Sequence, residues 1–142
     1  MTALPRQLPE AVSIREWRED DFPSIQALSA AERWTTPVER PDAAVRAWRS
    51  SRPALVAVVE GAVVGFVRCI SDGAVTTYVA ELLVAAPWRR RGIAVALLDA
   101  AQARVPGSRL DLLATSESRS FYERMEFRAF HGFRMSWNER KA

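Results

Sequence analysis

Two valine-rich runs, residues 54–59 and 62–70, are separated only by the dipeptide Glu-Gly at 60–61. β-Branched and apolar side chains favour strands, and a two-residue connection that contains glycine is typical of a tight β-hairpin. A second short turn, Ser-Asp-Gly at 71–73, leads into a third strand pattern over 75–84. The chain is therefore predicted to build its core around three successive strands.

Strand and helix patterns on either side of these runs complete the predicted fold. In chain order they are a strand over 12–17, a helix over 22–31, a second helix that begins near Asp42, the three central strands, a helix over 93–104, a strand over 109–115, a short helix over 118–125 and one or two closing strands over 127–137. The segment between the first two helices contains Pro37 and Pro41, which disfavour a helix interior. That segment is expected to be an exposed loop.

This order of elements predicts an α/β (α+β) fold. We expect a single domain over 12–138, in which a mixed central sheet of six to seven strands is flanked by helices on both faces, because each layer must bury its apolar side. A flexible N-terminal segment over 1–11 and a C-terminal tail over 139–142 are expected outside that domain.

The scarcity of cysteine and histidine excludes several kinds of site. Cys69 is the only cysteine and His131 the only histidine among 142 residues. Neither a disulfide framework nor a multi-histidine metal centre is therefore expected. No stretch has the length and apolar character of a signal peptide or a membrane span. We expect a cytoplasmic protein that holds no metal and binds no membrane.

Positive charge is scattered along most of the chain. The net charge is +3, and 19 of the 20 basic residues are arginines that alternate with acidic residues. A nucleic-acid-binding protein would need a continuous basic face, so nucleic acid is not an expected partner.

The only uninterrupted basic run, residues 89–91, lies between a strand that ends near Val84 and a helix that begins near Ile93. Unpaired N–H groups and the positive end of the helix dipole make such a turn an anion site, and arginines add charge suited to a pyrophosphate. Gly92 lets the backbone approach the anion closely because it has no Cβ. The turn is predicted to bind phosphate.

This turn resembles the signature of the GNAT superfamily of acetyltransferases. Val84-x-x-Pro87 is followed by Arg89-x-x-Gly92-x-Ala94, which is similar to the family pattern (Gln/Arg)-x-x-Gly-x-(Gly/Ala) for acyl-CoA. The order of elements agrees with the family over about 125 residues of the chain. The resemblance implies that acetyl-CoA is the acyl donor and that it pairs with a strand end and lies on the turn. The residues that it implies for these contacts are Leu82, Leu83, Val84, Arg89, Arg90, Arg91, Gly92, Ile93 and Ala94.

A second match lies downstream, where Ser118-x-x-Phe121-Tyr122 resembles the family's Ala-x-x-Phe-Tyr segment. The resemblance implies that Tyr122 is the general acid that returns a proton to the leaving thiolate. The alternative is a tyrosine that only packs against the cofactor. Further cofactor contacts are implied for Thr115, Ser118 and Phe121.

Two residues depart from the family pattern. Thr115 stands where the family often has asparagine, so its hydroxyl replaces only part of that contact. Glu126 stands where the family has glycine, and it must either adopt an uncomfortable turn or extend the helix.

A base is needed to accept the proton that an amine loses when it attacks a thioester. Alternation over 75–84 places Thr77, Val79, Glu81 and Leu83 on one face, with Glu81 as the only acid of the strand. Glu81 is therefore predicted to be the catalytic base. The alternative is an acid that binds an arginine or orients the acceptor. Asp111 ranks second, because a one-residue offset directs it to the opposite face of the sheet.

The resemblance implies an N-acetyltransferase that transfers the acetyl group directly to an amine in a ternary complex. The acceptor is implied to enter near residues 33–42, where Glu32 and Trp34 are candidates to contact it, although both can equally be packing residues. Small amines, amino acids, antibiotics and protein amines all stay open as acceptors. The rival function is a non-catalytic acyl-CoA sensor. A homodimer is expected, because the closing strands leave a sheet edge.

Overall fold

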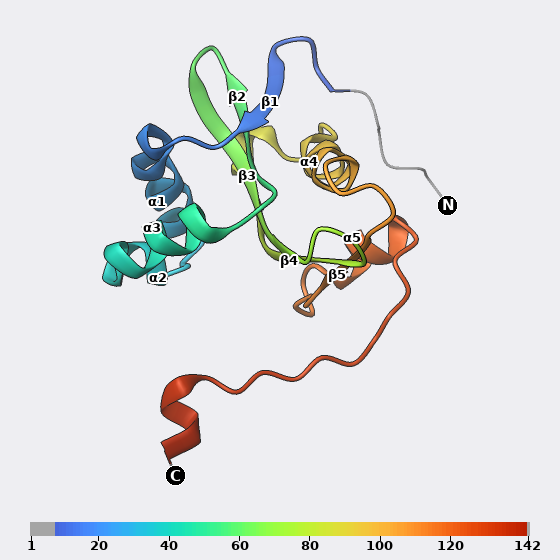
Figure 1. The fold of residues 1–142 in the computed structure, drawn as a ribbon. Helices are drawn as coiled ribbons and strands as arrows, with labels where there is room; N and C mark the ends of the chain where they lie inside the picture. The colour runs from blue at the N-terminus through green and yellow to red at the C-terminus, as the bar shows by residue number, and fades with distance from the viewer. Residues whose placement is uncertain (1–7, 142) are drawn as a thin grey trace. The chain divides into compact units, whose positions relative to one another are not determined.

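The three central strands belong to a five-stranded sheet in the computed structural model, which describes residues 8–141 (Figure 1). The strands are β1 (Val12–Glu16), β2 (Ala54–Val59), β3 (Ala62–Ser71), β4 (Thr76–Val84) and β5 (Arg109–Leu112), and they lie in that order in the sheet. Adjacent strands from β1 to β4 are antiparallel, and β5 runs parallel to β4. Glu60 and Gly61 both have positive φ, 48° and 82°, as a tight hairpin turn of this hand requires. The predicted hairpin is confirmed.

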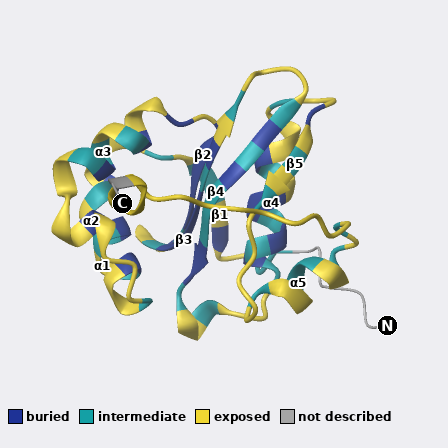
Figure 2. Ribbon diagram, turned by 90° about the horizontal axis from the view of Figure 1, so that it is seen from below, coloured by how far each residue is buried: buried dark blue, intermediate teal, exposed yellow. Residues whose placement is uncertain are grey.

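Helices cover both faces of this sheet, as predicted (Figure 1). The helices α1 (Phe22–Ala31) and α3 (Pro41–Ser50) lie on one face, and α4 (Ile93–Ala103) contacts β2, β3 and β4 on the other. The buried residues, dark blue in Figure 2, lie mainly in the sheet and on the helix sides that face it. On the α1 and α3 face the core consists of Ile25, Trp48, Ala54, Val56, Phe66 and Leu83. The mixed α/β architecture thus buries one apolar layer on each side of the sheet.

The segment between α1 and α3 is not a simple loop. It contains a four-residue helix, α2 (Thr36–Glu39), in which Pro37 lies at the first turn and is buried. Proline is tolerated there because the N–H group that it lacks would have no partner within the helix. The expectation of a loop throughout this segment was therefore wrong.

The sheet has five strands and not the six to seven that were predicted. The missing strands are those expected over 127–137, where residues 127–136 adopt no regular structure. Phe133 and Met135 alternate with polar residues as in a strand, but they are 94% and 64% exposed. An alternating pattern supplies apolar side chains but no partner strand, and a strand forms only where its backbone groups find one.

The described residues divide into two compact units. The strands β1 to β5 and the helices α1 to α4 belong to the N-terminal unit, residues 8–112, and the C-terminal unit covers residues 113–141. The C-terminal unit contains α5 (Arg119–Arg124) and a final 3₁₀ helix, η3 (Trp137–Lys141). Most of the predicted flexible segment, residues 1–7 of 1–11, lies outside the described residues. None of the helices within residues 8–141 combines the length and apolar character of a membrane span.

Candidate functional site

A β-bulge in β4 decides where Glu81 lies. Arg68 of β3 pairs with Glu81, but the next residue, Cys69, pairs with Val79, so that Ala80 has no partner opposite it. Residues directly opposite each other in a ladder share a face, and one extra residue reverses the alternation. Glu81 therefore shares its face with Arg68 and lies opposite to the face of Val79. The predicted shared face for Thr77, Val79, Glu81 and Leu83 was wrong, because regular alternation takes no account of a bulge.

The carboxylate of Glu81 has a partner on the same face. Nε of Arg68 donates to Oε2 of Glu81 at 3.0 Å, and Nη1 of Arg68 donates to the hydroxyl of Ser51 at 3.1 Å. The side chains of Arg68 and Glu81 are only 16% and 22% exposed. Glu81 is thus a partly buried carboxylate that one guanidinium holds in place, which is the arginine-binding role that the sequence left open.

Asp111 also lies on this face. It pairs with Tyr78 in the β4–β5 ladder, and Tyr78 pairs with Ile70, two residues from Arg68 in β3. The expectation that Asp111 lies on the opposite face from the predicted base was therefore wrong, and the bulge is again the reason. Its carboxylate lies 3.4 Å from Nε of Arg109, and both side chains are largely exposed.

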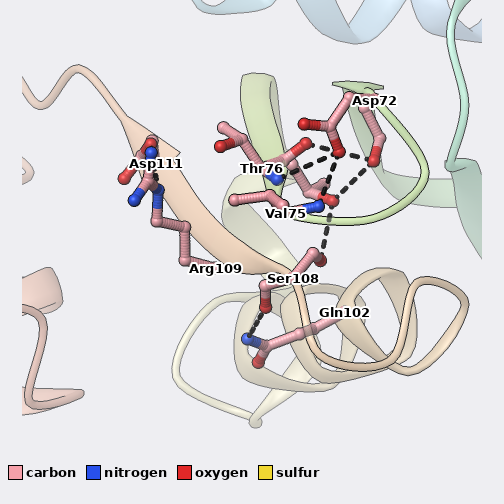
Figure 3. Close-up of polar contacts among 9 residues, drawn as sticks. Asp72, Val75, Thr76, Gln102, Ser108, Arg109 and Asp111 are labelled. Carbon is pink, nitrogen blue, oxygen red and sulfur yellow. Dashed lines mark hydrogen bonds and ion pairs between the residues drawn. The ribbon is translucent and has the colours of Figure 1, made fainter.

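The start of β5 is fixed against the start of β4 by several hydrogen bonds (Figure 3). The N–H of Arg109 donates to the carbonyl oxygen of Val75 at 2.9 Å, and Gln102 of α4 donates to the carbonyl oxygen of Ser108 at 2.9 Å. In the turn before β4, Oδ1 of Asp72 accepts the N–H groups of residues 74–76. These contacts set the register that places Asp111 beside Tyr78.

Residues 80–84, the C-terminal half of β4, have a neighbouring strand on one side only. β5 pairs with residues 76–79 of β4, whereas β3 pairs with residues 77–84 except at the bulge. Within residues 8–141, no strand lies beside the other side of residues 80–84. Backbone groups on that side need another partner, and an extended amide-containing arm such as pantetheine is suited to supply one. The strand end predicted to bind the cofactor, Leu82 to Val84, belongs to this open edge.

The turn before α4 has the backbone shape of an anion site. Arg90 and Gly92 have positive φ, 63° and 82°, and α4 begins directly afterwards. Within the described part of the chain, the backbone N–H groups of residues 90–95 donate no hydrogen bond. Successive free N–H groups around left-handed residues form a concavity that binds phosphate, and the helix dipole adds to it. A non-glycine residue in this conformation carries backbone strain, which is typical of functional turns.

The three arginines of the turn differ in their side-chain partners. Nε of Arg89 donates to the carbonyl oxygen of Val84 at 3.0 Å, and its Nη2 forms an ion pair with Glu32. The guanidinium of Arg91 lies 4.7 Å from the centre of the Trp88 ring. The side chain of Arg90 makes no hydrogen bond or ion pair with any residue from 8 to 141.

Glu32 and Trp34, the two residues predicted to contact the acceptor amine, lie just after α1. Glu32 is engaged by Arg89, and the ring of Trp34 meets that of Phe66 edge to face with centroids 6.4 Å apart. Phe66 is fully buried, whereas Trp34 is 36% exposed. Trp34 therefore covers the core and also presents part of its ring outside it.

Tyr122 lies in the C-terminal unit, on α5. Its ring contacts those of Phe121 and Phe127 edge to face, with centroids 5.0 and 5.5 Å apart. Burial among these groups raises the pKa of the phenol above its usual value, because a phenolate would lose its solvation. A neutral, proton-bearing phenol is therefore its form at physiological pH.

The polar residues before α5 satisfy each other. The hydroxyls of Thr115 and Ser118 lie 3.1 Å apart, and the hydroxyl of Ser118 also accepts the N–H of Thr115 at 3.0 Å. Glu126 adopts φ of 66°, so the helix ends there in the uncomfortable turn expected for glutamate at a glycine position. No three histidine, cysteine or acidic side chains within residues 8–141 gather in a way that could hold a metal ion.

Sequence reasoning missed Arg68 as the partner of Glu81 and missed the link from Arg89 to Glu32. A signal for the first was available, because Arg68 is the only basic residue of the run 62–70 and hairpin pairing brings that run beside Glu81. The second link joins residues 57 positions apart, for which the sequence carries no local pattern.

Comparisons with known proteins point to one family. Residues 50–129 match the acetyltransferase (GNAT) domain. A GNAT family acetyltransferase from Streptococcus pneumoniae superposes with a TM-score of 0.72 at 21% identity, over 89% of this chain and 97% of the other. A ribosomal-protein-alanine N-acetyltransferase from Brucella melitensis has a TM-score of 0.70 at 27% identity, over 90% and 100%.

A third similar structure contains a ligand. Naa50 from Arabidopsis thaliana, in complex with the bisubstrate analogue CoA-Ac-MVNAL, has a TM-score of 0.63 at 20% identity, over 85% of each chain. No curated protein matches the chain. The likeness to the Streptococcus and Arabidopsis proteins, at this identity, concerns the fold alone.

Proposed function

This chain belongs to the GNAT acetyltransferase family, and from that premise we propose that it transfers the acetyl group of acetyl-CoA directly to an amine. The observation that carries the proposal is the turn before α4. Its N–H groups at residues 90–95 donate to no group within residues 8–141, and Gly92 has φ of 82° immediately before the helix. This backbone fits a pyrophosphate and needs no side chain to create it.

Acetyl-CoA fits the residues that surround this turn. When bound, it supplies an acetyl group activated as a thioester. The residues proposed to hold it are Leu82, Leu83 and Val84 on the open edge of β4, Arg90, Arg91, Gly92, Ile93 and Ala94 at the turn, and Thr115, Ser118 and Phe121 in the C-terminal unit. Arg89 borders the turn, but its N–H already donates to the carbonyl oxygen of Ala86 at 3.3 Å. A backbone N–H near Leu82 or Leu83 would stabilise the negative charge that develops on the thioester oxygen.

Two side chains are proposed to move protons. Glu81 would accept the proton of the amine, either directly or through water, because an ammonium has no lone pair with which to attack. Arg68 would hold the carboxylate in one orientation. Tyr122 would return a proton to the departing thiolate, a task that suits a phenol kept neutral by burial.

The acceptor is proposed to be an amine of a small molecule, peptide or protein, and to lie against the face that carries Glu81 and Tyr78. The similar Brucella protein, at 27% identity, is a ribosomal-protein-alanine N-acetyltransferase, which supports a peptide or protein amine. Glu32 and Trp34 remain candidates for the rim of this site. The rival function, a non-catalytic acyl-CoA sensor, would use the same turn without turnover.

We also propose a cytoplasmic location and a homodimer. Cys69 is buried and unpaired, as a reducing compartment favours. β5 pairs only with β4 among the described residues, and several large apolar side chains of the C-terminal unit, such as Phe130 and Phe133, are exposed. A monomeric mass by light scattering across a wide concentration range would contradict the dimer.

A thiol-release assay separates the enzyme from the sensor. The protein is incubated with acetyl-CoA and a panel of primary amines, amino acids, aminoglycosides and short peptides with free N-termini or lysines. Free CoA is detected with a thiol reagent, and the acetylated amine is identified by mass spectrometry. Transfer to at least one amine above the rate of acetyl-CoA hydrolysis is expected. Binding of acetyl-CoA without transfer to any amine would favour the sensor.

A further inference from the structure

Arg89 is the first residue of the basic run 89–91, but its side chain is already bound to other residues of the protein. One nitrogen, Nε, donates to the carbonyl oxygen of Val84, and another, Nη2, forms an ion pair with Glu32. Val84 is the last residue of β4, and Glu32 follows the last residue of α1. One guanidinium therefore links the strand proposed to hold pantetheine to the loop after α1.

The loop after α1, residues 32–35, has a defined shape. The N–H groups of Glu32 and Trp34 donate to the carbonyl oxygen of Ser29 at 3.1 and 2.9 Å, and the N–H of Arg33 donates to Ala30 at 3.0 Å. Arg33 has φ of 62°, an uncommon conformation for a residue other than glycine. This local strain has to be offset by contacts that hold the loop in place.

Two contacts hold the loop against the strands. Trp34 lies edge to face against Phe66, which pairs with Leu83 in the β3–β4 ladder. The ion pair between Glu32 and Arg89 is the second contact, and Arg89 reaches the same strand end through Val84. The loop is thus attached to β3 at the residue that pairs with Leu83, and through Arg89 to the end of β4.

Arg90 and Arg91, the other two arginines of the turn, have side-chain donors available to bind an anion. The Arg90 side chain has no hydrogen bond or ion pair within residues 8–141, and Arg91 uses only the face of its guanidinium, against Trp88. A planar guanidinium presents its donors in a fixed fork, so a fork already occupied by a carbonyl and a carboxylate has fewer donors left for phosphate.

We propose that Arg89 is a positioning residue whose side chain clamps the loop 32–35 to the end of β4, while the phosphate is held by the backbone of the turn and by Arg90 and Arg91. The clamp fixes the acceptor-side loop relative to the strand that carries the cofactor. The role of this clamp in catalysis rests on the proposed function, whereas the attachment of the loop by Arg89 does not depend on that function.

Hydrogen–deuterium exchange of peptides that cover residues 29–36 tests the clamp without any ligand. We expect Glu32→Gln and Arg89→Gln each to speed exchange of the loop amides by about two- to five-fold, the usual worth of a partly exposed ion pair. The double variant should add nothing further, because both changes break one interaction. Arg90→Gln, with the same loss of charge one residue away, is the matched control and should leave loop exchange unchanged.

Calorimetric titration with acetyl-CoA completes the test. Arg90→Gln should weaken acetyl-CoA binding more than Arg89→Lys does. Lysine at position 89 keeps the positive charge, but it lacks the planar guanidinium that donates to Val84 and Glu32 together. Arg89→Lys should nevertheless speed loop exchange as Arg89→Gln does. Unchanged loop exchange in Arg89→Gln, together with a loss of acetyl-CoA affinity as large as that of Arg90→Gln, would overturn the clamp and make Arg89 a phosphate ligand. Failure of the unsubstituted protein to bind acetyl-CoA would instead contradict the proposed function and leave the exchange result standing.

Discussion

Replacing Glu81 by glutamine separates a catalytic base from an ion-pair partner, because glutamine keeps the size of the side chain and removes its charge. Glu81 and Arg68 are joined at 3.0 Å, with side chains 22% and 16% exposed. Exposed pairs contribute about 0.2–1 kcal/mol, and breaking a buried pair costs about 3–5 kcal/mol. We expect a loss of about 1–2 kcal/mol in the free energy of unfolding, which a domain with roughly 5–15 kcal/mol of stability tolerates.

The catalytic loss should be much larger than this stability loss can explain. A general base contributes roughly 10²- to 10⁴-fold in rate, so kcat should fall by that factor while the affinity for acetyl-CoA scarcely changes. The assay is thiol release with the best acceptor of the amine panel at saturating concentration. Urea unfolding of the same preparation gives the stability.

Arg68→Gln is the matched control, because it breaks the same ion pair and leaves the carboxylate of Glu81 in place. Its stability loss should be similar, but its kcat should stay within about ten-fold of the unsubstituted protein, since only the orientation of the base is lost. Equal and mild losses of kcat in both variants would refute the base assignment. Asp111, which shares the face of Glu81, would then be the acid to replace next.

Three further outcomes follow from the environments of single residues. Arg15 donates twice to the nearly buried Asp21 and holds the pKa of that carboxyl below its usual value. The ion pair therefore contributes to the free energy of unfolding above the unfolded pKa of about 3.9, and this contribution is lost as the pH falls through the lower folded pKa. Asp21→Asn should lower the free energy of unfolding by about 2 kcal/mol at pH 7. It should also weaken the dependence of that free energy on pH in the acid range, measured by urea unfolding. Tyr122→Phe should keep the aromatic packing but lower kcat, and the loss should shrink with a less basic leaving thiol; an equal loss with every thiol would leave Tyr122 a packing residue. Burial raises the pKa of Cys69 to about 11, so iodoacetamide at pH 8 should label it only on unfolding, and rapid labelling of the native protein would contradict its burial.

The fold could be predicted largely because its signals are local. The apolar run that became β2 was predicted with the bounds that the structure has, Ala54–Val59, and the helix from Ile93 was confirmed because its spacing and its stop at residues 106–107 are local. The strands over 127–137 were predicted from alternation alone, but pairing with a distant edge is not encoded in one segment.

In the candidate site, too, the features with a local sequence signal could be predicted and those set by tertiary contacts could not. The left-handed turn before a helix could be predicted from Gly92 and the helical spacing that follows it, and the N–H groups of residues 90–95 donate to no group in the described part of the chain. The face of Glu81 could not be predicted, because it depends on one extra residue, Ala80, in the ladder with β3. The partner of Arg89 could not be predicted either, since tertiary structure alone brings Glu32 to it.

The most direct test of the account is a calorimetric titration of acetyl-CoA into the unsubstituted protein, Gly92→Val and Gly73→Val. Both glycines have left-handed backbones, with φ of 82° and 80°, so both substitutions carry a similar strain of about 1–2 kcal/mol. A Cβ at Gly73 would meet nothing within 4 Å, in a hairpin remote in sequence from the turn. We expect one acetyl-CoA per chain, the same Kd for the unsubstituted protein and Gly73→Val, and affinity at least about ten-fold weaker, or about 1.4 kcal/mol, for Gly92→Val. Equal affinity in all three proteins, or no binding to the unsubstituted protein, would contradict the assignment of the turn as the cofactor site.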